Sequence, residues 1–278
     1  MLDLADRAAT LDAVCAVAAR AGQTILEIYA HSEIAVELKD DHSPLTAADR
    51  AAHAAIRAGL AELTPKVPLL SEESAPQDLA ERRSWSRYWL VDPLDGTKEF
   101  LKRNGEFTVN IALIEEHRAT LGVVLAPALE RSYYGAVDHG AWRRDAGSPP
   151  LPIAVREHAA APLEVVGSRS HPSGELAQYL NALGPHELCP MGSSLKICLI
   201  AEGAADLYPR LGPTSEWDTA AAQAILESAG GRMIDLAGRP LRYNTKGDLL
   251  NPHFLAFGDA RRDWLAPFQA SRGPQRRN

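Results

Sequence analysis

One segment of this chain, WLVDPLDGT at residues 89–97, places two carboxylates directly after an apolar run. The run has the composition of a short buried strand, and Asp92 and Asp95 follow it with a proline and Leu94 between them. The proline fixes one backbone angle, and Gly96 permits a sharp turn or the close approach of a ligand. The two carboxylates can therefore face one point, with the main-chain carbonyl of Leu94 between them as a further oxygen ligand.

Further carboxylates occupy similar places. Glu72 follows the apolar run VPLLS, and Asp218 lies in SEWDTAAA at the start of an expected helix. If these groups converge, two charges about 5 Å apart repel by roughly 3 kcal/mol at an effective dielectric of about 20. A divalent cation or a raised pKa removes that repulsion. An all-oxygen ligand set favours Mg²⁺ or Mn²⁺ over zinc, and two such ions about 4 Å apart hydrolyse phosphate esters. Taken singly, each acid is more simply a turn or cap residue.

The composition excludes several classes of protein. With 278 residues, of which 46% are hydrophobic and 23% charged, the chain has the make-up of a globular protein with one large or two ordinary domains. No apolar run approaches the roughly 20 residues of a membrane-spanning helix, and the acidic N-terminus lacks the features of a signal peptide. Three cysteines without metal-ligand spacing argue against a zinc site. The net charge of −7 argues against nucleic acid as a partner.

The pattern of apolar residues predicts an α/β fold with layers of helix and sheet. Helical spacing covers residues 4–30, and a second helix is expected from an N-cap at Thr46 to about Leu63. Three β-rich runs over residues 107–137 predict an antiparallel meander. Strands and helices alternate after the segment AGSPPLP, with helices expected from Ser193 and from about Trp217. The predicted divisions are a metal-binding N-terminal half, a C-terminal α/β half and a disordered tail, at residues 1–146, 147–270 and 271–278.

Three motifs, LSEE, WLVDPLDGTKEF and EWDTAAA, resemble the signature segments of the inositol monophosphatase superfamily, which are magnesium-dependent, lithium-sensitive phosphomonoesterases. The likeness extends from SPLTAAD to NPHFLAF, nearly the whole chain. It implies a layered sugar-phosphatase fold and two or three Mg²⁺ ions, with Mn²⁺ as a substitute and Li⁺ as an inhibitor. The metal ligands that it implies are Glu72, Asp92, the carbonyl of Leu94, Asp95 and Asp218.

The same resemblance implies roles for the residues that activate water. Thr97 in the DGT turn and Asp49 in the T-x-A-D segment correspond to the pair that positions and deprotonates the attacking water. A hydroxyl alone is a poor base, so an acidic partner makes chemical sense. The amides of Gly96 and Thr97 would receive the phosphate. Without the motif, Asp49 is an ordinary first-turn acid favoured by the helix dipole.

The choice of substrate depends on cations outside these motifs. A second phosphate on a nucleotide calls for Arg or Lys at a fixed distance from the metals. GSSLK and LYPR supply Ser193, Lys196 and Arg210, as in the branch of the superfamily that acts on bisphosphate nucleotides. Arg169 and His171 in GSRSH are weaker candidates for the adenosine or ribose side, and a polar turn explains them equally well.

We therefore predict a cytoplasmic enzyme that removes the 3′-phosphate from 3′-phosphoadenosine 5′-phosphate, giving AMP and phosphate, in support of sulfate assimilation. The sulfated nucleotide is a further expected substrate. Alternatives are an inositol monophosphatase, a fructose-bisphosphatase-like sugar phosphatase, or a non-catalytic protein that binds nucleotide or metal. The expected partner is a small phosphorylated nucleotide, and nucleic acid is not expected. A homodimer and peripheral contact with the inner membrane face are left open.

Overall fold

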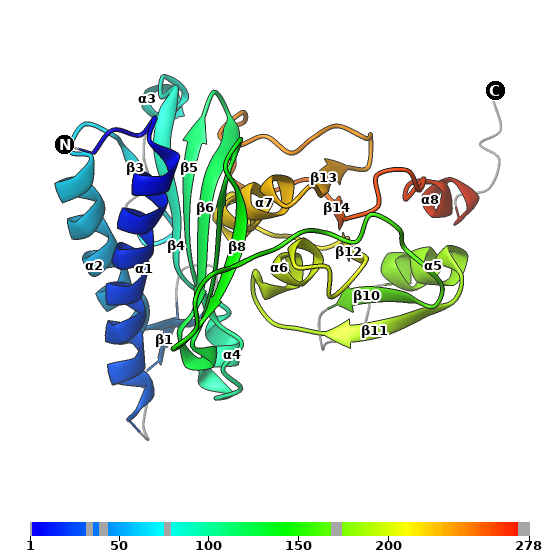
Figure 1. The fold of residues 1–278 in the computed structure, drawn as a ribbon, viewed down its shortest axis with the longest axis horizontal. Coiled ribbons are helices and arrows are strands. Elements are labelled where there is room, and N and C mark those ends of the chain that lie inside the picture. Colours follow the sequence, from blue (N-terminus) through cyan, green and yellow to red (C-terminus); the bar gives the residue numbers. More distant parts are fainter. Residues whose placement is uncertain (1, 32–35, 39–43, 75–78, 168–173, 272–278) are drawn as a thin grey trace.

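The computed structural model describes residues 2–31, 36–38, 44–74, 79–167 and 174–271. Its helices alternate with two β-sheets (Figure 1). The helices are α1 (Arg7–Tyr29), α2 (Ala47–Leu63), α3 (Leu79–Arg83), α4 (Thr97–Leu101), α5 (Gly174–Leu183), α6 (Leu195–Ala201), α7 (Glu216–Ser228), α8 (Ala266–Ser271) and the 3₁₀ turn η1 (Pro127–Leu129).

The larger sheet has the order β3-β4-β5-β6-β7-β8-β9 within the described residues. Its strands are β3 (Leu69–Ser71), β4 (Arg87–Asp95), β5 (Thr108–Glu115), β6 (Arg118–Ala126), β7 (Arg131–Ala136), β8 (Gly140–Asp145) and β9 (Leu151–Pro152). β3 runs parallel to β4, and every following pair is antiparallel. The meander predicted over residues 107–137 is confirmed, because β5, β6 and β7 pair antiparallel in chain order and are joined by short connections.

The smaller sheet has the order β11-β10-β12-β14-β13 in the described part of the chain. Its strands are β10 (Leu163–Gly167), β11 (His186–Pro190), β12 (Leu207–Arg210), β13 (Arg232–Asp235) and β14 (Phe254–Phe257). β10 is parallel to both of its neighbours, and β14 is antiparallel to both of its own. A separate hairpin pairs β1 (Val36–Leu38) with β2 (Pro44–Thr46).

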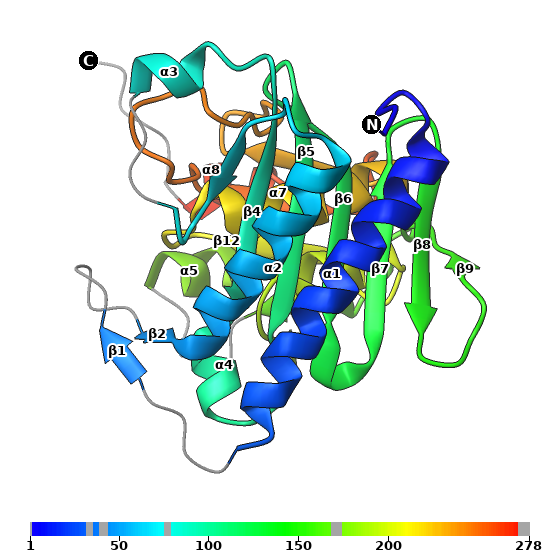
Figure 2. The same ribbon diagram turned by 90° about the vertical axis from the view of Figure 1, so that its left-hand side faces the viewer.

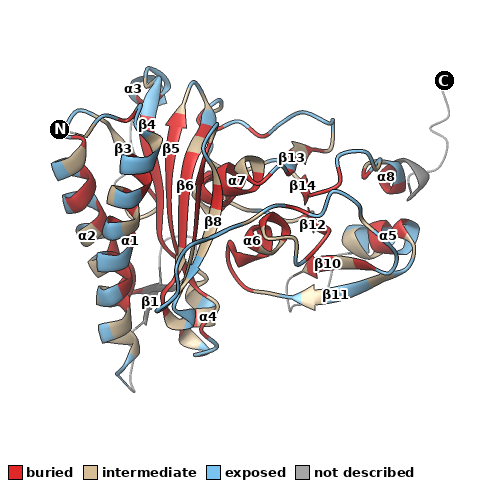
Figure 3. Cartoon of the chain, viewed as in Figure 1, coloured by how far each residue is buried: buried red, intermediate tan, exposed pale blue. Residues whose placement is uncertain are grey.

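The helices form layers on both sides of the larger sheet. α1 and α2 lie side by side over one face, which Figure 2 presents to the viewer. α7 packs on the other face against β5 and β6, with α6 beside it, and the smaller sheet lies beyond them. α5 and α8 pack together on the outer side of that sheet. Figure 3 shows the buried surfaces concentrated where these layers meet. The predicted layered α/β fold is confirmed.

The contact between β6 and α7 is close because Gly122 has no side chain. A Cβ at Gly122 would lie 2.0 Å from the main-chain oxygen of Ala221 in α7. Only glycine therefore lets the helix approach the sheet at this distance. The approach determines where the first turn of α7 lies relative to the carboxyl end of β4.

Some predicted boundaries are wrong by a few residues. The helix expected from Ser193 begins at Leu195, because Ser193 has a positive φ of 44° that is incompatible with an α-helix. α1 begins at Arg7, after an N-cap at Asp6, rather than at residue 4. In the described part of the chain no helix is long and apolar enough to cross a membrane.

The predicted division of the chain stays a prediction. β9, at Leu151–Pro152, still pairs with β8, so the larger sheet extends past residue 146. Most of the predicted tail, 272–278, lies outside the described residues.

Candidate active site

The carboxyl end of β4 brings Asp92 and Asp95 to one side of the sheet. Regular alternation would turn residues three apart to opposite faces. The pairing with β5 instead shifts register here, with Asp92 opposite Asn110 and Asp95 opposite Thr108. A bulge of this kind reverses the alternation. The amide of Leu94 donates a hydrogen bond of 3.0 Å to Oδ1 of Asp92 and helps to hold that carboxylate, which is 1% exposed.

Gly96 forms the turn that follows the two acids. Its φ of 90° lies in the left-handed region, and a Cβ here would be 3.1 Å from the carbonyl oxygen of Glu106. Both facts require glycine. α4 then begins at Thr97, whose hydroxyl donates to the carbonyl oxygen of Leu94 at 3.4 Å. Thr97 therefore lies directly beside the carbonyl that was predicted to bind metal.

α7 supplies the third carboxylate from its first turn. Ser215 is the N-cap of this helix, and its amide donates to Oδ2 of Asp218 at 2.9 Å, so Asp218 is part of a capping box. One oxygen of each of Asp92, Asp95 and Asp218 lies within 4.8 Å of the others. The capping role and the predicted ligand role are compatible, because a carboxylate has two oxygens.

Glu72 adds a fourth negative group. It follows β3, and its amide donates to the carbonyl oxygen of Val91 at 3.2 Å, which places it beside the end of β4. Burial raises the pKa of Asp92 well above its ordinary value, and the charges of Glu72, Asp95 and Asp218 raise it further. Burial and Asp95 likewise raise the pKa of Asp218 to about 7.

These observations fit a divalent metal site. The donors are carboxylate oxygens with a main-chain carbonyl nearby, which is the set that hard cations prefer. Burial and the repulsion of neighbouring carboxylates raise the pKa values of Asp92 and Asp218, so a nearby positive charge would stabilise their ionised forms. Bound Mg²⁺ would supply that charge.

Ser194 orients Asp95, and sequence reasoning missed it. Its hydroxyl lies 2.7 Å from Oδ2 of Asp95 and 2.9 Å from the carbonyl oxygen of Asp218, and it accepts a bond of 2.6 Å from Nδ2 of Asn110. Ser194 and Asn110 are 3% and 1% exposed. The polar Asn110 within the apolar run TVNIALI was a signal for such a role, since buried polar side chains need partners.

A cavity of about 240 Å³ opens beside these acids. Asp95, Gly96, Ser193, Lys196, Arg210 and Asp218, all predicted site residues, line it. Lys196 is 9% exposed, and its ammonium lies 5.7 Å from the centre of the Tyr208 ring. Burial lowers the pKa of Lys196, whereas the charge of Asp95 opposes this shift. A cation and an aromatic residue therefore line the same cavity as the carboxylates of Asp95 and Asp218.

Arg210 is held by its own loop. Its Nε donates to the carbonyl oxygen of Gly212 at 3.2 Å, and Nη2 donates to that of Pro213 at 2.5 Å. These bonds use two of the five N–H groups of the guanidinium and fix its orientation at the cavity. Ser193, with its positive φ, lines the same cavity beside Gly96.

Asp49 is buried at the start of α2. Its Oδ2 accepts bonds from the amide and the hydroxyl of Thr46, at 2.7 and 2.6 Å, and completes a capping box. β2, which ends at Thr46, packs against α4, the helix that begins with Thr97. The structure therefore brings the neighbourhoods of the two predicted catalytic residues together. Arg169 and His171 lie outside the described residues.

Comparisons with known proteins identify the relatives of this chain. The profile of the inositol monophosphatase family matches residues 6–262. The chain belongs to this family. A structure described as an inositol monophosphatase from Zymomonas mobilis shares the fold with a TM-score of 0.74 at 26% identity, covering 96% of this chain and 99% of that one.

Other relatives in the inositol monophosphatase family are more similar. The 3′(2′),5′-bisphosphate nucleotidase CysQ of Salmonella typhimurium is 52% identical over 245 residues, 88% of this chain and 98% of that protein. The crystal structure of CysQ from Bacteroides thetaiotaomicron has a TM-score of 0.79 and 43% identity, covering 92% of this chain and 98% of that one. The resemblance seen in the sequence is confirmed, and the family's metal dependence agrees with the acidic group found here.

Proposed function

We propose that this chain is a metal-dependent phosphatase that converts 3′-phosphoadenosine 5′-phosphate to AMP and phosphate, in support of sulfate assimilation. The observation that carries the proposal is that Lys196 and Arg210 line the same cavity as Asp95 and Asp218, two members of the acidic group that Asp92 completes. One end of the cavity suits metal and the phosphate to be removed, and the other end suits a second phosphate. Relatives of high identity named as bisphosphate nucleotidases support the same reading.

Asp92, Asp95 and Asp218, with Glu72 and the carbonyl of Leu94, would hold two or three Mg²⁺ ions, for which Mn²⁺ would substitute and which Li⁺ would oppose. When bound, the ions neutralise the carboxylates and stabilise negative charge on the phosphoryl group. Ser194 and Asn110 keep the carboxylate of Asp95 in place through hydrogen bonds.

The protein's own residues then position and deprotonate water. The oxygen of a water molecule attacks phosphorus, and the bond between phosphorus and the ribose 3′-oxygen breaks. The hydroxyl of Thr97 takes up the proton of this water and passes its own to Asp49. The amides of Gly96 and Thr97 donate to the phosphoryl oxygens as negative charge develops on them. The leaving 3′-oxygen gains a proton from solvent.

Lys196 and Arg210 bind the remaining 5′-phosphate, and Ser193, which lines the same cavity, adds a hydroxyl beside it. Charge-assisted bonds of this kind are the stronger class of hydrogen bond. Arg169 and His171 stay candidates for the adenosine side. Cytoplasmic location and a homodimer also stay predictions.

The test compares phosphate release from 3′-phosphoadenosine 5′-phosphate and from inositol 1-phosphate with saturating Mg²⁺. We expect a preference of about 100-fold for the nucleotide, equivalent to roughly 2.7 kcal/mol. Lys196→Ala should raise KM for the nucleotide and hardly change the hydrolysis of inositol 1-phosphate. Lys102→Ala is the matched control, since Lys102 lines the same cavity but is exposed.

Equal rates on the two substrates, or equal effects of Lys196→Ala on both, would contradict the nucleotide assignment and leave a sugar phosphatase with the same metal site. No turnover of either substrate would contradict the phosphatase itself.

A further inference from the structure

A second cavity, of about 510 Å³, lies at the far end of α7 from the candidate active site. Asp218 belongs to the first turn of this helix, whereas Glu227 and Ser228 at its last turn line the second cavity. Nine residues of helix separate Asp218 from Glu227, or about 14 Å at 1.5 Å per residue. The second cavity is therefore separate from the catalytic one.

Two arginines from distant parts of the chain meet at this cavity. Arg118 begins β6, and Arg242 follows β13. Main-chain atoms of His117 and Tyr243, the neighbours of these arginines, are joined because the amide of Tyr243 donates to the carbonyl oxygen of His117 at 3.1 Å. Nδ1 of His117 also lies 2.9 Å from the carbonyl oxygen of Tyr243. This pair of contacts holds the two arginines at a common wall.

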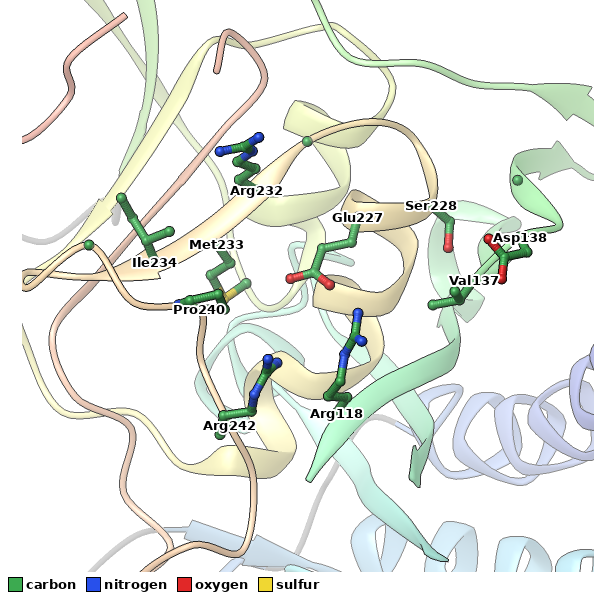
Figure 4. A pocket seen from close by; sticks show the side chains of 13 residues that line it. Arg118, Val137, Asp138, Glu227, Ser228, Arg232, Met233, Ile234, Pro240 and Arg242 are labelled. Carbon is green, nitrogen blue, oxygen red and sulfur yellow. The ribbon is translucent and has the colours of Figure 1, made fainter. Parts of the chain in front are cut away.

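Glu227 is near both guanidinium groups, but no described carboxylate oxygen lies within 4.0 Å of either one. Among the described residues, Arg118 makes no ion pair, and the side chain of Arg242 makes only a 3.5 Å bond to the carbonyl oxygen of Leu241. Figure 4 shows Arg118 and Arg242 extending from two sides toward Glu227, with Arg232 farther along the wall. Several other arginines of this chain are paired with Asp or Glu, as Arg143 is with Asp145 at 2.6 Å.

Glu227 is held near these arginines by a hydrogen bond within α7. Its Oε1 accepts a bond of 2.7 Å from Nε2 of Gln223, and the hydroxyl of Tyr243 donates to Oε1 of Gln223 in turn. The same hydroxyl lies 3.4 Å from Oγ1 of Thr219, so a chain of polar contacts runs along α7. Burial raises the pKa of Glu227, and the bond from Gln223 and the charges of Arg118 and Arg242 oppose this.

Ser228, which lines the cavity, carries an unsatisfied buried hydroxyl. Oγ of Ser228 is buried and has no hydrogen-bond partner within the described part of the protein. Buried polar atoms normally have a partner. Two guanidinium groups without an ion pair and one fixed carboxylate thus line a space of the size that small-molecule ligands occupy, with the hydroxyl of Ser228 buried beside it.

We propose that this cavity binds a small organic phosphate that also carries a hydrogen-bond donor, at a site separate from the catalytic one. Arg118 and Arg242 bind the phosphate, because the planar guanidinium pairs with two phosphate oxygens at once. Glu227 accepts a bond from a hydroxyl or amino group of the same ligand. The negative charge of this carboxylate disfavours an anion that has no hydrogen-bond donor, and the expected ligand is therefore a phosphate with a hydroxyl or amino group.

The test uses two probes that a phosphomonoesterase cannot hydrolyse, because each has a carbon–phosphorus bond. They are 2-aminoethylphosphonate, which carries a donor, and ethylphosphonate, which does not. The magnesium-loaded full-length protein is titrated with each while the Nε–Hε signals of its arginines are followed by NMR, with assignments from single Arg→Lys variants. We expect saturable shifts of the Arg118 and Arg242 signals, and at least about threefold tighter binding of the aminophosphonate.

Three variants test the residues. The variant R118A/R242A lacks both arginines whose signals are followed in the native protein, so the Nε–Hε signal of Arg232 is followed instead. Its affinity for 2-aminoethylphosphonate should fall at least about tenfold. R20A/R57A is the control: it removes two exposed charges from the helix layer on the opposite face of the larger sheet. It should leave affinity unchanged. Glu227→Gln should abolish the preference between the two probes.

Several outcomes would overturn the proposal. Shifts at Arg210 alone would show that the probes bind only in the catalytic cavity. Equal weakening by R20A/R57A would show a general effect of charge. A lower melting temperature of R118A/R242A with unchanged probe affinity would show that the arginines only balance Glu227 and the carboxyl end of α7. An unchanged probe preference in Glu227→Gln would remove the assigned role of that residue and with it the ligand class.

Discussion

Ser194→Ala removes the hydroxyl that connects Asn110 to Asp95, and the structure predicts its cost. In the native protein this hydroxyl accepts a bond of 2.6 Å from Nδ2 of Asn110 and lies 2.7 Å from Oδ2 of Asp95. It has one proton, which the carboxylate attracts more strongly than the carbonyl oxygen of Asp218 does. The substitution therefore breaks one neutral and one charge-assisted hydrogen bond in a buried place.

The size of the stability loss in Ser194→Ala follows from the polar groups that the substitution leaves unsatisfied. Among the described residues, Oδ1 of Asn110 has no hydrogen-bond partner, and Nδ2 donates to Ser194, so the substitution leaves the buried amide of Asn110 unsatisfied. A buried group left unsatisfied costs about 1–3 kcal/mol, and a bond to a charged group contributes about 1.5–3 kcal/mol. We expect the free energy of unfolding to fall by about 2–4 kcal/mol, because the two effects overlap. Loss of such a supporting contact also weakens metal affinity about 10- to 100-fold.

Urea unfolding without magnesium measures the first effect, and the magnesium dependence of kcat/KM measures the second. Asn110→Ala and the double variant S194A/N110A complete a double-mutant cycle. Because the double variant removes the stranded amide together with its partner, its loss of stability should be about 1–2 kcal/mol less than the sum of the single losses. Ser148→Ala, in an exposed turn, is the control and should change neither quantity. A loss below about 0.5 kcal/mol for Ser194→Ala, with unchanged magnesium dependence, would refute the assigned role.

Three further predictions follow from packing, pH and metal binding. Gly122→Ala should lower the free energy of unfolding by about 3 kcal/mol or more, because its Cβ would lie 2.0 Å from a main-chain oxygen of α7; an unchanged urea midpoint would contradict that contact. Burial alone would raise the pKa of Glu115, but hydrogen bonds from Thr120 and Arg7 hold it below its ordinary value of 4.5. The ionised Glu115 therefore contributes its full stabilisation above pH 4.5, and this contribution is lost as the pH falls through the lower pKa of the folded protein. The loss of unfolding free energy caused by Glu115→Gln, measured by urea unfolding, should shrink over that pH range. A loss that stays constant with pH would contradict this. Magnesium at 100 times its Kd should stabilise the fold by about 2.7 kcal/mol in calorimetry, and Asp218→Asn should remove most of this gain; an equal gain in the variant would show that Asp218 is not a ligand.

Local chemistry explains why much of the site could be read from the sequence. The apolar run before Asp92, the glycine after Asp95 and the capping residue Thr46 act over a few neighbouring positions, so their effects are visible along the chain. The positions of most helices and strands could be predicted for the same reason, because the spacing of apolar residues is also a local feature. The boundary at Ser193 was missed because its positive φ depends on contacts with the turn at Gly96, which is remote in sequence.

The remaining features come from contacts between distant segments. Sequence alone determined the class of fold, the family and the set of carboxylates, since these depend on composition and short-range spacing. The tertiary structure decided that a bulge turns Asp92 and Asp95 to the same side and that Ser194 meets Asn110 across two elements. It also brought Arg118 to Arg242 at the far end of α7. These arrangements depend on strand register and on the approach of helix to sheet, which the whole core determines together and no local stretch of residues specifies.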